Sequence, residues 1–209
     1  MNLENPQSKD AQAASHAARV ALRHNARTRR RALGAGEHAR LSAALCHNLL
    51  RCAFFVRAKR YAAFVSNDGE PDLAGLRFSA LAAGKTAYLP VIHRSRLWFL
   101  PQEGAMALNR YGIPEPSSRP GSRISLLGLD LVLMPLVAFD EGGARLGMGG
   151  GFYDRTFGYL RHRTHWRRPR LIGVAFECQR VNQVPAQPWD VRLDGIMTER
   201  GLTLPVRRT

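Results

Sequence analysis

Short apolar runs that alternate with helix-like stretches are the feature that most constrains the fold. Runs at residues 129–136 and 171–176 have the length of buried strands, about 4–8 residues. The pattern predicts further strands at 61–65, 86–89, 97–100 and 195–198, and helices at 17–32, 37–50 and 72–83. Because strands alternate with helices, the sequence predicts an α/β fold with a mostly parallel sheet.

Length and composition predict one domain. The chain has 209 residues, 45% of them hydrophobic, which suits a single α/β domain at residues 16–209 after a flexible tail at 1–15. No apolar run approaches the about 20 residues of a membrane span, and residues 1–10 lack the apolar region of a signal peptide. Three cysteines, an odd number, argue against a disulfide framework. We expect a cytoplasmic monomer that does not bind membranes.

The segment RLGMGGGFYDR at residues 145–155 is the strongest chemical motif. It follows a predicted strand and precedes a helical pattern that begins at Thr156. Glycines in such a place let backbone N–H groups turn toward an anion, to which a helix N-terminus adds its positive dipole end. Neither familiar phosphate motif fits, because Met148 replaces the Walker A lysine and Phe152 replaces the third Rossmann glycine. A tight turn beside a packed helix is the alternative interpretation.

Four more segments, together with this motif, resemble the signatures of the 5-formyltetrahydrofolate cyclo-ligase family. They are RVALR at 19–23, SNDGEPD at 66–72, NRYGIPEP at 109–116 and WDVRLDGIMTE at 189–199. The resemblance implies a three-layer α/β/α sandwich related to ribose-phosphate isomerase and CoA-transferase-like folds. It also implies ATP-dependent cyclisation of 5-formyltetrahydrofolate to 5,10-methenyltetrahydrofolate, with release of ADP and phosphate.

The resemblance also implies roles for particular residues. ATP is expected to contact Arg19 and Arg23, and the run Arg145, Leu146, Gly147, Met148, Gly149, Gly150, Gly151, Phe152 and Tyr153. Folate is expected to contact Val65 and Glu70, and to border the part of the same run from Met148 to Phe152. Arg145, Tyr153 and Asp154 are the expected catalytic residues.

Magnesium is the implied cofactor, with Asp154 and Asp194 as its ligands and Asp190 as an alternative to Asp194. Magnesium prefers oxygen ligands and usually takes one or two carboxylates together with substrate phosphates. Asp154 could equally be the N-cap of the following helix. Less firmly, Trp98, Tyr111 and Glu115 could line the folate pocket.

The charge of the chain leaves room for several kinds of anionic partner. Lys plus Arg exceed Asp plus Glu by 31 − 16 = 15, and arginines gather at residues 27–31 and 161–170. ATP and a folate, with or without a polyglutamate tail, are polyanions that suit this charge. A nucleic-acid-binding module is disfavoured because the basic clusters lack interleaved aromatic residues. The arginines could also form solvated basic faces, and the chain could be a sugar-phosphate isomerase of related fold.

Overall fold

The computed structural model describes residues 6–117, 120–162 and 168–205. Its helices are α1 (Pro6–Arg31), α2 (Ala35–Arg51), α3 (Ala53–Arg57), α4 (Ala74–Ala82) and α5 (Phe152–Phe157), with 3₁₀ turns at Pro120–Ser122, Leu126–Gly128, Gly158–His162 and Glu177–Gln179. Its strands are β1 (Arg60–Ala62), β2 (Thr86–His93), β3 (Arg96–Pro101), β4 (Met106–Leu108), β5 (Pro114–Pro116), β6 (Leu131–Pro135), β7 (Ala138–Phe139), β8 (Arg145–Leu146), β9 (Arg170–Val174), β10 (Gly195–Thr198) and β11 (Gly201–Thr203).

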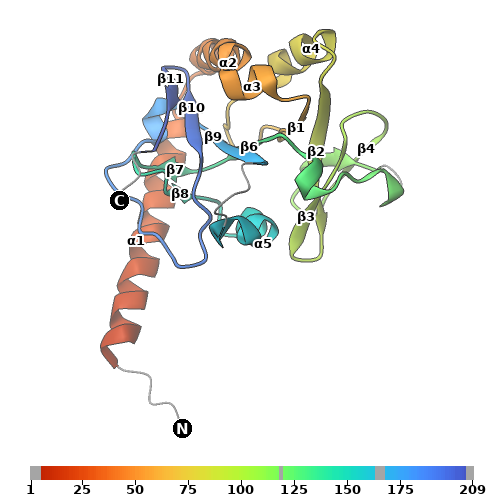
Figure 1. Ribbon diagram of the computed structural model, residues 1–209. Coiled ribbons are helices and arrows are strands. Elements are labelled where there is room, and N and C mark those ends of the chain that lie inside the picture. Colours follow the sequence, from red (N-terminus) through yellow and green to blue (C-terminus); the bar gives the residue numbers. More distant parts are fainter. Residues whose placement is uncertain (1–5, 118–119, 163–167, 206–209) are drawn as a thin grey trace.

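The central sheet has seven strands in the order β11-β10-β9-β6-β1-β2-β3 (Figure 1). The five inner strands are parallel to one another, and only the edge strands β11 and β3 run antiparallel to their neighbours. The prediction of an α/β fold with a mostly parallel sheet is therefore confirmed. Two small hairpins, β4–β5 and β7–β8, lie outside this sheet.

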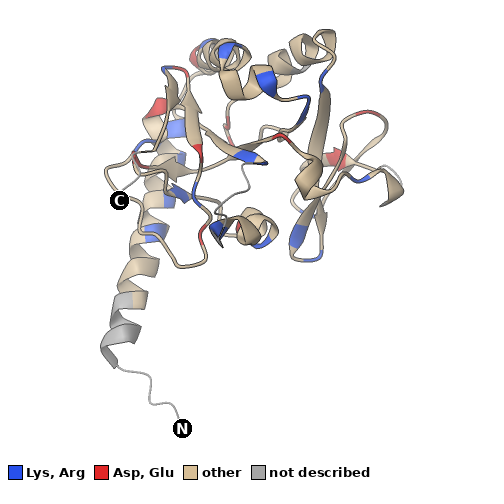
Figure 2. Cartoon of the chain, in the orientation of Figure 1, with Lys and Arg blue, Asp and Glu red and all other residues tan. Residues whose placement is uncertain are grey.

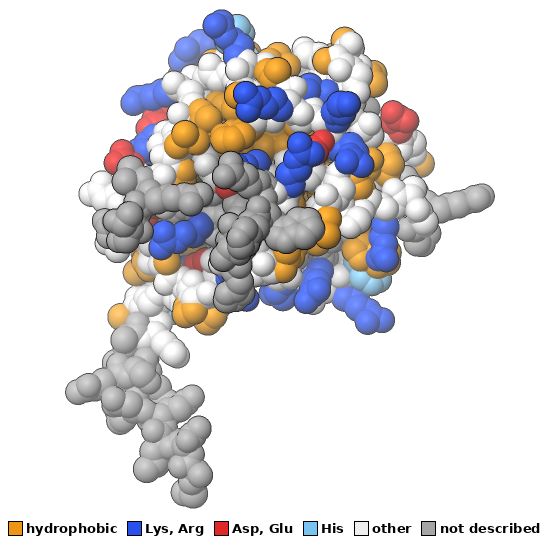
Figure 3. Space-filling view, in the orientation of Figure 1, with side chains coloured by type: hydrophobic (Ala, Val, Ile, Leu, Met, Phe, Trp, Pro, Cys, Tyr) orange, Lys and Arg blue, Asp and Glu red, His pale blue; other side chains and the backbone are white. Residues whose placement is uncertain are grey.

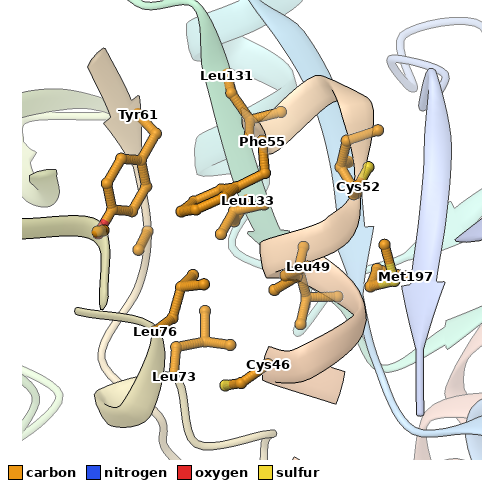
Figure 4. Close-up of a cluster of buried hydrophobic side chains, with 14 of the residues drawn as sticks. Cys46, Leu49, Cys52, Phe55, Tyr61, Leu73, Leu76, Leu131, Leu133 and Met197 are labelled. Atoms are coloured by element: carbon orange, nitrogen blue, oxygen red, sulfur yellow. The ribbon is translucent and has the colours of Figure 1, made fainter. Parts of the chain in front are cut away.

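Both faces of the sheet are buried, as the continuous apolar strands require. Leu131 and Leu133 of β6 face one core, which α2, α3 and α4 cover (Figures 1 and 4). Val132 and Met134, the alternate residues of the same strand, face the other core, to which α5 contributes Phe157. Helices and turns cover both faces of the sheet, so the sheet is the middle of three layers.

The order of strands reverses at the centre of the sheet. From β1 the chain continues to β2 on one side, and the next parallel strand, β6, is inserted on the other side of β1. The segments that follow the carboxyl ends of β1 and β6 therefore diverge, and such a reversal of strand order is the usual ligand position in open α/β sheets. The acidic loop (residues 66–70) follows β1, and the β7–β8 hairpin follows β6.

Several predicted boundaries need correction. α1 begins at Pro6, so the expected helix start at residue 17 is too late, and residues 6–15 of the expected tail are helical (Figure 1). Arg145 and Leu146, expected in a loop, form β8, and the glycine loop proper comprises residues 147–151. The segment at 114–125, which the sequence predicts to be a loop, contains β5 and one 3₁₀ turn, Pro120–Ser122. Among the described residues, no helix has the length and apolarity needed to cross a membrane.

Candidate active site

The arginine-bearing face of α1 joins the loops at the carboxyl ends of the strands. Spacings of four, four and three residues place Arg19, Arg23, Arg27 and Arg30 on one face of the helix. Figure 2 shows that blue segments, which mark Lys and Arg, recur along α1. Arg19 donates from Nη1 to the carbonyl of Pro185, at 2.6 Å, and to Oδ2 of Asp190, at 2.9 Å. These arginines therefore contact specific partners and do not form a solvated face.

Arg23 contacts the glycine loop directly. Its Nε donates to the carbonyl oxygen of Gly147 at 2.9 Å, and its guanidinium lies beside Gly149. Burial, with the nearby charge of Arg19, lowers the pKa of Arg23. Burial of the Arg23 cation against the loop's backbone costs solvation free energy, and an anionic polyphosphate bound at the loop would offset this cost.

The glycine loop needs its glycines for backbone geometry. Gly149 and Gly151 have φ angles of 104° and 62°, in the left-handed region that side chains disfavour. Gly151 is the N-cap of α5, so Asp154 lies in the first turn of that helix and is not its cap. The side chain of Met148 is exposed, whereas that of Leu146 is buried in the core. Leu146 can therefore meet a ligand only through its backbone.

The Phe152 ring lies against the glycine loop. A Cβ atom on Gly150 would lie only 2.8 Å from the Phe152 ring, so a larger residue there requires the ring to move. The ring also meets Tyr111 edge-on at 6.2 Å between centroids, with Arg155 stacked at 5.4 Å. Tyr111 is 55% exposed. Aromatic and cationic side chains thus border the loop, as a flat, anionic ligand would need.

Arg145 and Tyr153 bring buried, incompletely satisfied donors to the site. Arg145 is buried and pairs with Asp154 at 2.8 Å, and Asp154 also accepts the backbone N–H of Val191 at 3.0 Å. Within the described part of the chain, Nε of Arg145 and the hydroxyl of Tyr153 are buried without a hydrogen-bond partner. Burial and the neighbouring charge of Glu70 raise the pKa of Tyr153. Tyr153 therefore stays a neutral donor, and buried unpaired donors mark where a ligand would complete the structure.

Glu70 is the buried carboxylate of the site. It is 7% exposed, and its Oε2 accepts the Asn67 N–H at 3.3 Å. Burial raises the pKa of Glu70 to about 7, although the Arg30 cation opposes this shift. A buried carboxyl that titrates near neutrality has the properties of a functional group. Val65, the other expected folate contact, is partly buried against the core beside the same loop.

The three candidate metal ligands already have cationic partners. Asp154 pairs with Arg145, Asp190 with Arg19, and Asp194 with Arg170. Asp190 and Asp194 line a hollow of about 950 Å³, whose wall includes the Val191 that Asp154 contacts. Among the described residues, no three His, Cys, Asp or Glu side chains gather in a way that could hold a metal ion. Asp190 and Asp194 thus line one hollow, whereas Asp154 contacts only its wall, and the described residues form no preformed cation site.

Glu115 and Trp98, which could line the folate pocket, contact neighbouring residues of the protein. Oε2 of Glu115 accepts the Ile92 N–H at 3.2 Å and Asn109 Nδ2 at 3.1 Å, which joins the 109–116 segment to β2. Trp98 stacks on His93 at 3.7 Å between centroids. These contacts organise the β2–β3 hairpin and its neighbouring segment.

The part played by Arg30 is not evident from the sequence. It belongs to the basic run at residues 27–31, yet its side chain has 0% exposure and contacts the acidic loop. The helical spacing from Arg19 is the available signal, but it gives no information on which arginine of a run is buried.

Comparisons with known proteins identify the family and the fold. Residues 15–199 match the 5-formyltetrahydrofolate cyclo-ligase family. The chain is 39% identical over 178 residues to the 5-formyltetrahydrofolate cyclo-ligase of Escherichia coli K12, covering 82% of this chain and 95% of the relative. The fold resembles the 5,10-methenyltetrahydrofolate synthetase of Aquifex aeolicus, with a TM-score of 0.75, 29% identity, and 89% and 92% of the two chains covered. A second such synthetase, from Mycoplasma pneumoniae, has a TM-score of 0.68 at 26% identity, with coverages of 87% and 98%. The chain belongs to the 5-formyltetrahydrofolate cyclo-ligase family.

Proposed function

We propose that the protein catalyses the ATP-dependent cyclisation of 5-formyltetrahydrofolate to 5,10-methenyltetrahydrofolate. The formyl oxygen attacks the γ-phosphorus of ATP and ADP leaves, which gives an N5-iminium phosphate. N10 then attacks the activated carbon, N10 loses its proton, and phosphate is expelled. Both substrates must therefore bind side by side, with the formyl oxygen near the γ-phosphate.

One observation carries this proposal beyond family membership. The Tyr153 hydroxyl interacts electrostatically with both the buried carboxylate of Glu70 and the cation of Arg145. Among the described residues, this hydroxyl and Nε of Arg145 are buried donors without a hydrogen-bond partner. Glu70 belongs to the loop assigned to folate, whereas Arg145 precedes the loop assigned to ATP. Interacting groups from the acidic loop and from both sides of the glycine loop support a reaction in which one substrate transfers a group to the other.

The chain's own residues supply binding and charge. Arg19, Arg23 and the run 145–153 are proposed to bind ATP, with the N–H groups of the glycine loop directed at phosphate oxygens. Val65 and Glu70 are proposed to bind the pterin, whose amino and N–H edge needs a paired acceptor. Arg145 and Tyr153 are the proposed donors that stabilise the transferring phosphoryl group, and Asp154 orients Arg145 through their ion pair.

Magnesium belongs to the proposal as the partner of ATP. Bound with the nucleotide, it supplies charge neutralisation to the phosphates. Asp154 and Asp194 are the residues proposed to hold it, with Asp190 as the alternative to Asp194. Because each of these carboxylates pairs with an arginine in this structure, the ion would share the carboxylates with guanidinium groups.

The direct experiment follows absorbance in the near ultraviolet with 5-formyltetrahydrofolate, ATP and magnesium. The methenyl product has its own chromophore, so formation of that band with stoichiometric release of ADP is expected. Omission of ATP is the control and should abolish the signal. Release of ADP without the band, or no reaction at all, would contradict the proposal.

The proposal extends to setting and partners. The free thiols of Cys46, Cys52 and Cys178 suit a reducing cytoplasm, and we propose that the protein acts there as a monomer on folates with or without a polyglutamate tail. Nucleic acid remains disfavoured. Figure 3 shows Lys and Arg side chains scattered over the visible face, without a continuous stripe. Arginines of the first basic cluster are also engaged by Asp68.

A further inference from the structure

We propose that Arg30 is the positioning residue for folate recognition: it fixes the acidic loop against the carboxyl end of β6 and presents its positive charge to Glu70. This inference rests on the proposed binding of the pterin by Glu70. It adds to the site a residue of α1 that acts through Glu70 and does not itself touch the substrate.

Arg30 contacts both of the diverging segments. Its Nε donates to the carbonyl of Asp68 at 2.9 Å and its Nη2 to Oδ2 of Asp68 at 2.7 Å. Its Nη1 donates to the carbonyl of Leu136 at 3.3 Å. Asp68 follows β1 and Leu136 follows β6, so a single guanidinium joins the two segments that diverge at the reversal of strand order.

The guanidinium of Arg30 also lies close to Glu70. Nη1 of Arg30 is 3.9 Å from Oε1 of Glu70, close enough for a strong charge interaction and longer than a hydrogen bond. Arg30 therefore attracts the carboxylate without using its lone pairs. Those acceptor positions stay available for the N–H donors of a pterin, which a direct salt bridge would compete with.

The acidic loop has a strained shape that Arg30 holds in place. Asp68 has a φ of 55° and Gly69 a φ of 76°, so two consecutive residues adopt left-handed backbone geometry, which is costly for Asp68. The contacts of Arg30 with both the carbonyl and the carboxylate of Asp68 stabilise this turn. Ser66 Oγ donates to the Glu70 carbonyl at 2.6 Å, which fixes the other side of the turn.

Glu70 faces charged and titratable groups from four elements. Arg30 of α1 lowers its pKa, whereas Asp68 of its own loop raises it. The Tyr153 hydroxyl of α5 interacts with it electrostatically. The His38 ring of α2 places Nε2 at 3.0 Å from the Glu70 carbonyl. Of these groups, Arg30 is the cation that favours the ionised carboxylate, so its removal should shift the ionisation of Glu70 toward higher pH.

The test compares Arg30→Met and Arg30→Lys with a matched control, Arg31→Met. Arg31 also binds Asp68 from the same helix, but its side chain is 56% exposed. We expect Arg30→Met to raise KM for 5-formyltetrahydrofolate at pH 7 about tenfold while KM for ATP changes less than about twofold. The pH midpoint of kcat/KM for folate should move up by about one unit or more, with recovery near pH 9. Arg30→Lys should keep the midpoint nearer that of the wild type, and Arg31→Met should change neither quantity.

Two further measurements keep the proposal open to contradiction. If Arg30→Met does not fold, Arg30→Lys carries the comparison in a double-mutant cycle with Glu70→Gln, and its effect on folate KM should vanish in the Glu70→Gln background. Carbon-13 NMR titration of the Glu70 carboxyl, identified by its absence in Glu70→Gln, tests the charge interaction without turnover. Equal losses for both substrates, an unshifted midpoint or additive effects in the cycle would overturn the proposal. Absence of turnover in the wild-type protein would instead contradict the proposed function, and the NMR titration would still decide the role of Arg30.

Discussion

The two ends of the parallel strands use their charged residues in opposite ways. At the amino ends, Oδ2 of Asp130 accepts the N–H groups of Lys59 and Arg60, and Oδ2 of Asp194 accepts that of Leu171. Their second carboxylate oxygens pair with Arg168 and Arg170. At the carboxyl ends, Glu70 and the donors of Arg145 and Tyr153 are buried with incomplete partners.

This difference shows which end of the sheet is arranged for a ligand. Asp130 and Asp194 at the amino ends satisfy backbone N–H groups that the sheet leaves open, so they help complete the fold, and the proposed magnesium binding by Asp194 would be additional to this role. Groups at the carboxyl ends retain unused hydrogen-bonding capacity at the cost of stability. Asp68 and Glu70 show both behaviours within one loop. Burial opposes ionisation of Asp68, yet hydrogen bonds from Arg27 and Arg31 outweigh it and lower its pKa to about 2.

Breaking the Arg145–Asp154 ion pair beside the glycine loop should have the largest effect. Arg145→Ala leaves the partly buried Asp154 without its cation, and removal of one partner of a fully buried pair, which sets the upper bound, costs about 3–5 kcal/mol of unfolding free energy. ATP binding should weaken more than folate binding. Chemical denaturation and calorimetry measure the two effects. Arg155→Ala, at an exposed arginine beside the same loop, is the control and should lose less than about 1 kcal/mol.

The double variant Arg145→Ala, Asp154→Asn separates stability from function. It should regain part of the lost stability, because the uncompensated charge is gone, but not the ATP affinity. Unchanged nucleotide affinity in both variants would remove Arg145 from the ATP site.

The pH dependence of stability gives a second test of the comparison. Glu70 has a pKa of about 7 in the folded protein, against an ordinary value of 4.5. Because this pKa is raised, the folded state binds more protons than the unfolded state between pH 4.5 and 7. The stabilising contribution of Glu70 is therefore complete below pH 4.5 and is lost as the pH rises through 7. The full shift corresponds to ~3 kcal/mol. Denaturant unfolding at about pH 5 and about pH 8 should show a larger loss in the wild type than in Glu70→Gln, and parallel curves would contradict the assignment.

Glu70→Gln should damage folate use and spare ATP binding. The amide keeps one acceptor oxygen and adds donors that face the donors of the pterin. Loss of a hydrogen bond to a charged group costs about 1.5–3 kcal/mol, or roughly 10- to 150-fold in kcat/KM for 5-formyltetrahydrofolate. Steady-state kinetics with each substrate varied in turn measures it. A rise in KM for ATP alone would put Glu70 on the wrong side of the site.

The smallest expected effects concern the carboxylates at the amino ends of the strands. They test which residue is the second proposed magnesium ligand. Asp194→Asn should lose about 1 kcal/mol of stability with its ion pair and, as a proposed ligand, require more magnesium for half-maximal activity. Asp154→Asn should share the magnesium effect. Asp130→Asn is the matched control at the neighbouring strand end and should lose stability alone. Normal magnesium dependence in Asp194→Asn, with Asp190→Asn impaired, would move the second ligand to Asp190.

The sequence predicts the fold better than it predicts the site. The apolar runs at β6, β9 and β10 identify the parallel sheet because burial on both faces makes them continuous. The β7–β8 hairpin escapes detection because each strand has two residues, too few for a period. The motif identifies Glu70, but its burial and raised pKa depend on the packing of α1 and α5. For the same reason, the run of arginines at 27–31 does not distinguish the buried Arg30 from the exposed Arg31.

The contacts of α1 have a consequence for the order of folding. Its arginines reach Asp68, Gly147 and Pro185 over sequence separations of 38, 124 and 166 residues. The helix is therefore synthesised first, but its last loop partner emerges only near the end of the chain. Closing such long loops is entropically costly and slow, so we expect docking of α1 to follow formation of the sheet. Partly folded chains that contain the whole parallel core would still lack the joined loops, so substrate binding should report the final step of folding.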